Sequence, residues 1–247
     1  MANPFSLEGK TILITGASSG IGRACAVVCA SAGAKCILTA RNKDRLKATL
    51  DSLAGEEHLM FLADLTKDDD RRALISALEK VDGVILNAGI NDKSLVKFLK
   101  EDFICKMLNT NFTAAAMLAQ GLLKGKKLNA GGSIVFMSSI SAFFPSITNA
   151  MYGATKAAIN QFARVLSLEV MPQRIRVNSI EPAFVETEML HAYALQDNIN
   201  AIREQNFNGR FTTPEEVAYA CQYLLSDAAQ MITGTTMVID GGYTIKK

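Results

Sequence analysis

The stretch TILITGASSGIG, residues 11–22, decides the fold of this 247-residue chain. Residues 11–15 have the pattern of a buried strand, and the apolar segment after the glycines has the pattern of a helix. Between a strand and a helix, Gly16 permits a tight turn, Gly20 lets the backbone approach a pyrophosphate, and Gly22 allows close helix–strand packing. The first amides of the helix then face the anion. Three glycines also occur in ordinary turns, so the flanking elements are what make this motif indicate a dinucleotide site.

The alternation of apolar runs and helical segments continues along the whole chain. Further strands are expected at 35–40, 58–63, 83–86, 133–138, 175–180 and 236–239, and helices at 21–32, 43–53, 68–79, 101–124, 151–170 and 214–226. This alternation predicts parallel strands with right-handed crossovers. Strands that are apolar throughout predict helices on both faces. We therefore expect an α/β fold, a single doubly wound parallel sheet of Rossmann type over residues 1–247, with a substrate lid at about 183–212.

Composition argues against several classes of protein. The 26 basic and 24 acidic residues give a net charge of +2, which does not indicate a nucleic-acid-binding face. No apolar run approaches the roughly 18 residues of a membrane span, and the first residues lack a signal-peptide pattern. Five cysteines without CxxC pairs, and two histidines without neighbours at zinc spacing, argue against disulfides and a metal site. We expect a cytoplasmic protein.

The end of the second expected strand bears on the choice of cofactor. An NAD site usually has an acidic residue there, about 20 residues after the glycines, to bind the ribose hydroxyls. This chain instead has Thr39-Ala40-Arg41-Asn42. Arg41 could bind a 2′-phosphate with paired hydrogen bonds, or it could simply face solvent at a helix start. The sequence favours NADP (as NADPH) over NAD.

Candidate catalytic residues occur in the second half of the chain. Tyr152 and Lys156 are four residues apart in an expected helix and so share one face. A neighbouring ammonium favours the phenolate form of a tyrosine, whose pKa is ordinarily about 10. Such a pair is common on protein surfaces, but here Ser139 follows the fifth expected strand and Asn111 interrupts an otherwise apolar helical stretch. Asn87-Ala88-Gly89 likewise follows the fourth expected strand.

Taken together, these motifs resemble the short-chain dehydrogenase/reductase family. The matching segments follow the family's order over essentially the whole chain: TGASSGIG at 15–22, NAG at 87–89, Asn111, Ser139, YGATK at 152–156, IRVNSIEP at 175–182 and ITGTTMVIDGG at 232–242. The resemblance implies that Tyr152 is the general acid in ketone reduction and the base in alcohol oxidation. It implies that Lys156 binds the nicotinamide ribose and biases the pKa of Tyr152, that Ser139 holds the substrate carbonyl, and that Asn111 keeps a water linking Lys156 to solvent.

The resemblance also implies a set of cofactor contacts. Asp64 would meet the adenine amino group, residues 87–89 would line the adenosine, and Val185 and Thr187 would lie near the carboxamide. The expected cofactor-binding residues are Gly16, Ser18, Ser19, Gly20, Ile21, Gly22, Arg41, Asn42, Asp64, Leu65, Asn87, Ala88, Gly89, Tyr152, Lys156, Pro182, Val185 and Thr187. Two departures stand out: Pro182-Ala183 replaces the usual Pro-Gly, and the short stretch from 64 to 87 predicts a trimmed third helix.

Substrate choice is expected to depend on the lid and on the loop before Tyr152. These segments are apolar and suit an acyl chain or another hydrophobic ketone, although the same residues could instead pack the lid onto the body: Phe143, Phe144, Ile147, Phe184, Met189, Leu190, Tyr193 and Leu195. The overall pattern is most similar to the 3-oxoacyl-(acyl-carrier-protein) reductases. That similarity implies NADPH-dependent reduction to a 3-hydroxyacyl product, and an acidic acyl carrier protein that could dock on Lys124, Lys126, Lys127, Arg174 and Arg176.

Two alternatives remain open at this point. One is a dehydrogenase or reductase of another secondary alcohol, such as a polyol, a sugar or a steroid. The other is a non-catalytic nucleotide-sensing protein, against which the set of Tyr152, Lys156, Ser139 and Asn111 argues. A homotetramer is implied by the resemblance alone.

Overall fold

A computed structural model describes residues 3–193 and 196–245. Within them, seven parallel strands form one sheet in the order β3-β2-β1-β4-β5-β6-β7. The strands are β1 (Thr11–Thr15), β2 (Lys35–Ala40), β3 (Leu59–Leu62), β4 (Val81–Leu86), β5 (Leu128–Met137), β6 (Arg176–Pro182) and β7 (Thr236–Ile239). The chain reverses its direction of winding between β1 and β4, so the doubly wound parallel sheet predicted from the sequence is confirmed.

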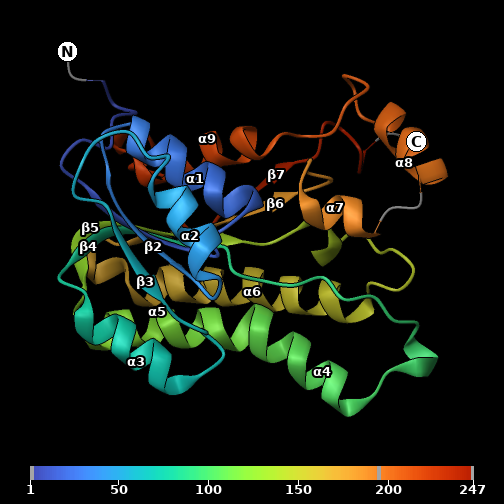
Figure 1. The fold of residues 1–247 in the computed structure, drawn as a ribbon, viewed down its shortest axis with the longest axis horizontal. Helices are drawn as coiled ribbons and strands as arrows, with labels where there is room; N and C mark the ends of the chain where they lie inside the picture. Colours follow the sequence, from blue (N-terminus) through green and yellow to red (C-terminus); the bar gives the residue numbers. More distant parts are fainter. Residues whose placement is uncertain (1–2, 194–195, 246–247) are drawn as a thin grey trace.

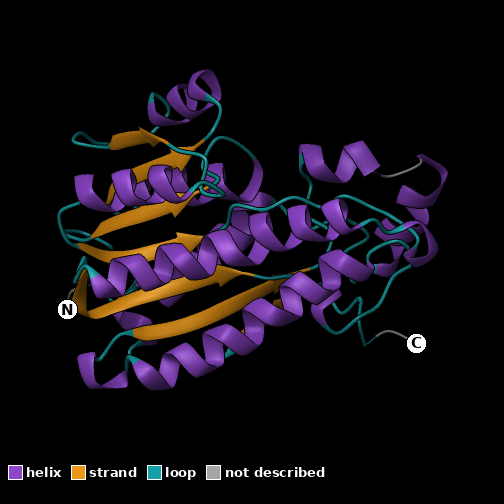
Figure 2. Ribbon diagram, turned by 90° about the horizontal axis from the view of Figure 1, so that it is seen from below, coloured by secondary structure: helices purple, strands orange, loops and turns teal. Residues whose placement is uncertain are grey.

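Helices cover both faces of the sheet (Figures 1 and 2). One face carries α1 (Gly20–Ser31), α2 (Lys43–Leu50) and α9 (Pro214–Leu225); the other carries α3 (Asp68–Ala77), α4 (Glu101–Leu108), α5 (Ala114–Lys124) and α6 (Ala150–Glu169). Alternate residues of one strand serve the two cores. Ile12 and Ile14 pack in the core under α1 and α9, whereas Leu13 packs in the core under α3, α5 and α6.

The helix expected over 101–124 is not continuous. A π-helical turn, η2 (Asn109–Thr113), separates α4 from α5 and contains the buried Asn111. A π turn holds one residue more than an α turn and is frequent at functional sites. Short 3₁₀ turns complete the helical elements: η1 (Val96–Phe98), η3 (Ile140–Ala142), η4 (Met171–Gln173) and η5 (Asp227–Ala229).

The trimmed third helix expected from the sequence is present. α3 ends at Ala77, and β4 begins at Val81, so the third helix and its connection are short. The start of α9 has a capping box: the Thr213 hydroxyl accepts from the Glu216 amide, and the Glu216 carboxylate accepts from the Thr213 amide.

The segment expected to form the lid, called the lid below, follows β6 and lies beyond the carboxyl ends of the strands, at the right of Figure 1. It contains α7 (Glu188–Tyr193) and α8 (Gln196–Gln205). Leu195, expected to line the substrate cleft, lies outside the described residues, and so does the side chain of Tyr193.

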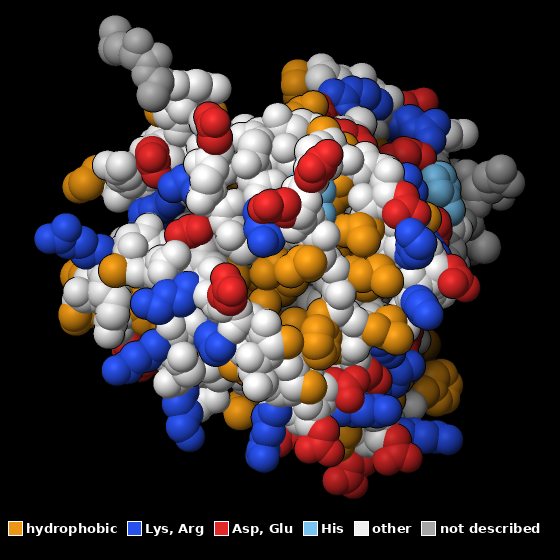
Figure 3. Space-filling model, turned by 60° about the vertical axis from the view of Figure 1, so that its left-hand side comes forward, with side chains coloured by type: hydrophobic (Ala, Val, Ile, Leu, Met, Phe, Trp, Pro, Cys, Tyr) orange, Lys and Arg blue, Asp and Glu red, His pale blue; other side chains and the backbone are white. Residues whose placement is uncertain are grey.

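The surface carries charges of both signs. On the face seen in Figure 3, a group of hydrophobic side chains lies among interspersed Lys, Arg, Asp and Glu. In the part of the chain that the structure describes, no helix is long and apolar enough to cross a membrane.

Candidate functional site

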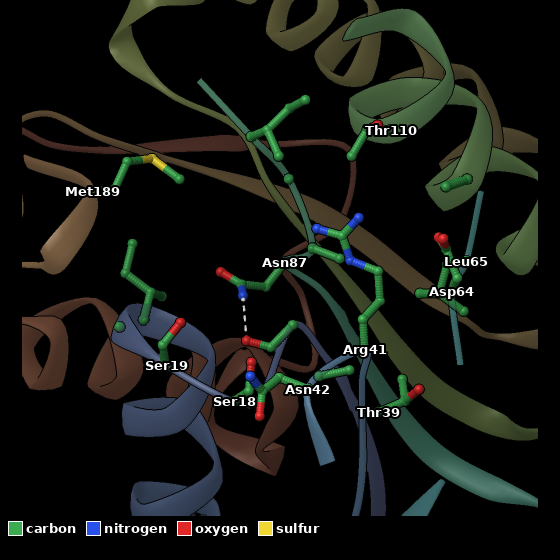
Figure 4. A pocket seen from close by; sticks show the side chains of 18 of the residues that line it. Ser18, Ser19, Thr39, Arg41, Asn42, Asp64, Leu65, Asn87, Thr110 and Met189 are labelled. Carbon is green, nitrogen blue, oxygen red and sulfur yellow. Dashed lines mark hydrogen bonds between the residues drawn. The ribbon is translucent and has the colours of Figure 1, made fainter. Parts of the chain in front are cut away.

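A cleft of ≈320 Å³ lies at the carboxyl edge of the sheet, where β1, β2, β3 and β4 end and the lid begins. Figure 4 shows side chains from all these segments around it, with Met189 on one side and Arg41, Asp64 and Leu65 on the other. Thirteen of the residues expected to bind a cofactor line this cleft: Gly16, Ser18, Ser19, Gly20, Ile21, Arg41, Asn42, Asp64, Leu65, Asn87, Ala88, Gly89 and Thr187.

The glycine-rich turn forms one wall because there is no room for side chains within it. A Cβ added at Gly22 would overlap the carbonyl oxygen of Gly16, and one added at Gly16 would lie 3.0 Å from the Cα of Ala88. Gly16 and Gly20 also have positive φ angles, 65° and 51°, which glycine adopts without strain. Gly22 itself serves helix–strand packing and does not line the cleft.

Asn87 holds this turn against the end of β4. Its Nδ2 donates to the carbonyl oxygens of Thr15 (3.1 Å) and Gly16 (3.4 Å). In return, the Thr15 hydroxyl accepts from the amides of Asn87 (2.9 Å) and Ala88 (3.0 Å). The two strand ends are thus fixed to each other before any ligand binds. The sequence analysis missed Thr15, although a threonine at the end of an apolar strand, directly before the glycines, is a signal for such a contact.

The second wall contains Arg41 and Asp64. Arg41 follows β2 and is exposed. Figure 4 shows its side chain among those that surround the cleft. Partial burial acts to raise the pKa of Asp64, but hydrogen bonds from Thr66 and the charge of Arg41 outweigh it, so this pKa lies below its ordinary value. Asn42 has a second task, since its Oδ1 caps α2 by accepting from the Arg45 amide (3.0 Å).

These walls fit a dinucleotide. No described side chain caps the start of α1, and there the helix dipole and the free amides favour a pyrophosphate. At the end of β2, Thr39 also lines the cleft, and its buried hydroxyl oxygen has no hydrogen-bond partner among the described residues.

The four expected catalytic residues gather beside this cleft. The Lys156 Nζ lies 5.5 Å from the centroid of the Tyr152 ring and donates to the Met137 carbonyl (2.7 Å) at the end of β5. Ser139, two residues further on, lies near enough to Tyr152 for its hydroxyl to act on the pKa of that tyrosine. Gly89 connects the cleft to this group, because a Cβ added there would lie 3.2 Å from Asn111 Oδ1 and 3.7 Å from Lys156 Nζ.

The side chain of Asn111 is occupied by protein partners. Its Oδ1 accepts from the Ile90 amide (2.8 Å), and its Nδ2 donates to the Ile90 carbonyl (2.9 Å) and the Thr155 hydroxyl (3.2 Å). It therefore clamps the loop after β4 to α6 directly behind Lys156. The side chain of Asn111 thus joins two segments of the chain, and the water that the family resemblance places at Asn111 stays a prediction.

Burial governs the proton affinities of the catalytic pair. Loss of hydration raises the pKa of Tyr152 to about 12 and outweighs the hydrogen bond with Ser139. Burial also lowers the pKa of Lys156 to about 8. The sequence led us to expect a lowered pKa for Tyr152, but the protein's own groups produce the opposite shift. Tyr152 is consequently protonated at neutral pH, as a proton donor must be, and in the protein without cofactor it is a weaker acid than a free tyrosine.

The predicted cofactor-binding residues and the residues that line the cleft differ at several positions. Pro182 ends β6 and Val185 is buried, where its carbonyl accepts from the Thr187 hydroxyl (3.2 Å); neither lines the cleft. Met189, expected among the apolar residues that choose the substrate, also lines the cleft. The lining residues that sequence reasoning missed are Thr39, Ala40, Ala63, Thr66, Ile90, Thr110, Ala114 and Glu188. Most of them are immediate neighbours of predicted residues and belong to no motif of their own.

The apolar residues around the lid divide into two groups. Phe144 and Phe184 pack against Tyr243, with ring centroids 5.6 and 5.1 Å apart, and Phe184 also packs against Phe211 at 6.0 Å. These two phenylalanines therefore follow the packing alternative. Three other apolar side chains of these segments are exposed: Phe143, Ile147 and Met189.

One expected docking residue is placed wrongly by the sequence interpretation. Arg176 is buried, and its guanidinium donates to the carbonyls of Leu224 (2.6 Å) and Ser226 (3.2 Å) at the end of α9. It satisfies carbonyls that a helix end leaves free and is unavailable to a partner. Lys124, Lys126 and Arg174 are exposed, whereas the ammonium of Lys127 donates to the Leu78 carbonyl.

Known proteins resemble this chain over nearly its whole length. The model of a family described as enoyl-(acyl carrier protein) reductase matches residues 16–244. A 3-oxoacyl-(acyl-carrier-protein) reductase of Aquifex aeolicus is 33% identical over 96% of this chain and 98% of its own. An NAD-dependent glycerol dehydrogenase of Listeria innocua is also 33% identical, over 98% and 96%. A solved 3-ketoacyl-(acyl-carrier-protein) reductase of Brucella melitensis, complexed with NADH, has a TM-score of 0.88 at 29% identity, covering 97% and 100%.

Proposed function

This chain is an oxidoreductase of the short-chain dehydrogenase/reductase family, to which the matching enoyl-(acyl carrier protein) reductase model belongs, and we propose that it uses NADPH to reduce a 3-oxoacyl thioester. The observation that carries this proposal is the grouping of Ser139, Tyr152 and Lys156 beside the dinucleotide cleft. Carbonyl reduction needs a proton donor next to the carbonyl oxygen, and the Tyr152 hydroxyl is the group in this arrangement that can supply the proton.

The residues divide the work of the reaction among them. When bound, the dinucleotide supplies a hydride to the carbonyl carbon of the substrate. The Ser139 hydroxyl would hold the carbonyl oxygen, and Tyr152 would transfer its proton to that oxygen, so that hydride and proton together yield the secondary alcohol. Lys156, buried with a single carbonyl partner at Met137, would use its remaining protons to bind ribose hydroxyls. Asn111 would hold Lys156 in place through Ile90 and Thr155.

The choice of NADPH depends on Arg41. Residues 39–42, at the end of β2 and just after it, include no acidic residue. Arg41 among them brings a positive charge to the cleft. A charged hydrogen bond of this kind contributes about 1.5–3 kcal/mol. Arg41→Ala is therefore expected to raise the Kd of NADPH about 10- to 100-fold and to leave that of NADH nearly unchanged, as measured by fluorescence titration. Equal changes for both dinucleotides would contradict the assignment of NADPH.

A second candidate is the oxidation or reduction of another secondary alcohol. It is favoured by the glycerol dehydrogenase of Listeria innocua, which is as similar in sequence as the Aquifex reductase. The two are separated by following dinucleotide absorbance with acetoacetyl thioesters alongside a panel of polyols, sugars and steroids. Turnover of the thioesters supports the first proposal; turnover of a polyol alone would replace it with the second.

Carrier docking is proposed for the exposed cations Lys124, Lys126 and Arg174. An acyl carrier protein is acidic, so these residues would increase its rate of encounter. Replacing all three with Glu is expected to raise KM for a carrier-bound substrate and to spare KM for the same acyl group on a small thiol. An equal change for both substrates would remove the docking role.

Assembly and compartment are also proposed rather than observed. Met117 on α5 and Val165 and Leu168 on α6 are exposed apolar residues that a homotetramer could bury; analytical ultracentrifugation would show the mass of the assembly. The five cysteines are free thiols, which suits the reducing cytoplasm.

A further inference from the structure

An ion pair joins the two sides of the cleft across 143 positions of sequence. Arg45 lies on α2, and Glu188 is the first residue of α7 and lines the cleft. One guanidinium nitrogen, Nη2, lies 2.6 Å from Oε1 and 2.7 Å from Oε2 of Glu188. The pair therefore connects the helix after the Arg41 strand to the lid.

The lid lies directly against the glycine-rich turn next to this pair. A Cβ added at Gly20 would lie 3.2 Å from the methyl group of Thr187, the residue before Glu188. On the other side of the cleft, α2 begins at the cap residue Asn42, which is itself part of the lining. Both ends of the ion pair therefore adjoin the cleft, near Asn42 on one side and next to Thr187 on the other.

We propose that the Arg45–Glu188 pair is a latch that keeps α7 over the cleft and limits the rate at which the dinucleotide leaves. This inference rests on the proposed binding of a nicotinamide dinucleotide in the cleft. Arg45 and Glu188 are positioning residues, because they act on the cofactor through the lid. The Glu186–His191 pair (3.0 Å) lies within the lid and does not cross the cleft.

The strength of the pair suits a contact that opens in every turnover. Its side chains are 45% and 75% exposed, and exposed ion pairs contribute at most about 1 kcal/mol. Such a pair shifts the balance between open and closed lids a few-fold without locking the lid shut. Release of product dinucleotide by lid opening is a common rate-limiting step in enzymes.

The test measures dissociation rates of NADPH and NADH by stopped-flow fluorescence. Glu188→Gln and Arg45→Gln are each expected to raise both rates about two- to fivefold. The double charge exchange, Arg45→Glu with Glu188→Arg, restores the pair and should return the rates to within about twofold of the original. Raising ionic strength should speed release from the unaltered protein by a larger factor than from either single variant, because only the unaltered protein has the pair to lose.

Asp51→Asn is the matched control. It removes the Lys47–Asp51 pair, which has similar geometry (2.8 and 2.9 Å) and exposure but lies wholly within the α2 segment. Release rates should not change in this variant, because the pair does not reach the lid.

Three results would overturn the latch. The first is unchanged release in both single variants, and the second is a charge exchange that fails to restore the rate. The third is faster release of NADPH alone in Arg45→Gln with no effect of Glu188→Gln, which would instead assign Arg45 to the 2′-phosphate. Failure of the unaltered protein to bind either dinucleotide would overturn the proposed function as well, and titration shows this before any variant is made.

Discussion

The two sides of the dinucleotide cleft are held in place by different kinds of contact. On the sheet side, Asn87 and Thr15 join strand ends through hydrogen bonds to backbone groups, and the glycine turn leaves no free space. On the lid side, α7 is tied down by the exposed Arg45–Glu188 pair. The first side therefore presents fixed geometry to the reaction, while the second can open. Precise positioning and exchange of ligands are thus assigned to separate parts of one site.

The largest expected effect is a loss of turnover in Tyr152→Phe, which tests whether the proton donor lies on the fixed side of the site. Tyr152→Phe removes the proton donor and keeps the ring, so turnover should fall by about 10²- to 10⁴-fold. The Kd of NADPH should change by less than about twofold, because the walls of the cleft are untouched. Steady-state kinetics and fluorescence titration measure both quantities. Retained turnover would remove Tyr152 from the mechanism.

A second effect concerns the stability of the fixed side as a function of pH. Burial lowers the pKa of Lys156 from 10.5 to about 8, so between pH 8 and 10.5 the unfolded chain binds more protons than the folded one. The free energy of unfolding should therefore rise with pH across this window, by about 3 kcal/mol from this group. Urea denaturation of the unaltered protein and of Lys156→Met at several pH values checks it. The difference between the two curves should vary with pH; a constant difference would contradict the shift.

A third effect breaks the fixed wall itself. Asn87→Ala removes the donors to the Thr15 and Gly16 carbonyls, and the expected loss is about 1–3 kcal/mol of unfolding free energy. The Kd of both dinucleotides should rise together, because the whole turn loosens. Chemical denaturation and titration measure these changes. A loss of affinity without loss of stability would make Asn87 a direct ligand rather than a support.

The smallest effect is expected on the lid. Met189 is exposed and lines the cleft, so Met189→Ala should leave the unfolding free energy within about 0.5 kcal/mol. The ratio of kcat/KM between long and short acyl thioesters should change a few-fold, because one apolar contact is lost. Denaturation together with kinetics on the two substrates tests this. A large loss of unfolding free energy would show that Met189 is needed to hold the lid in place, as Asn87 is on the sheet side.

Short-range patterns predicted much of the fold and of the site. The bounds expected for β1, β2 and β7 agree with the structure, because runs of apolar residues between turn signals mark buried strands. The residues predicted to bind the cofactor after β1, β2 and β4 line the cleft, because parallel strands end at one edge of the sheet.

Features that depend on tertiary contacts escaped the sequence analysis. The π turn at Asn109–Thr113 lies inside a stretch expected to be one helix, and the contacts of Asn111 with Ile90 and Thr155 join residues far apart in the sequence. Arg176 was expected on the surface because it is charged, yet it is buried and donates to a carbonyl at the end of α9. The Arg45–Glu188 pair joins residues far apart in the sequence, and neither belongs to a motif.

The burial of Lys156 has a consequence for the life of the protein in a cell. A molecule without cofactor keeps an ammonium group buried with one carbonyl partner, and so it unfolds more readily than one whose ribose-binding protons are engaged. Ligands that bind only the folded state shift the folding equilibrium by mass action, and cellular proteases remove the unfolded fraction. The amount of this enzyme should therefore follow the supply of dinucleotide, so that starvation for the cofactor reduces the number of enzyme molecules as well as their activity.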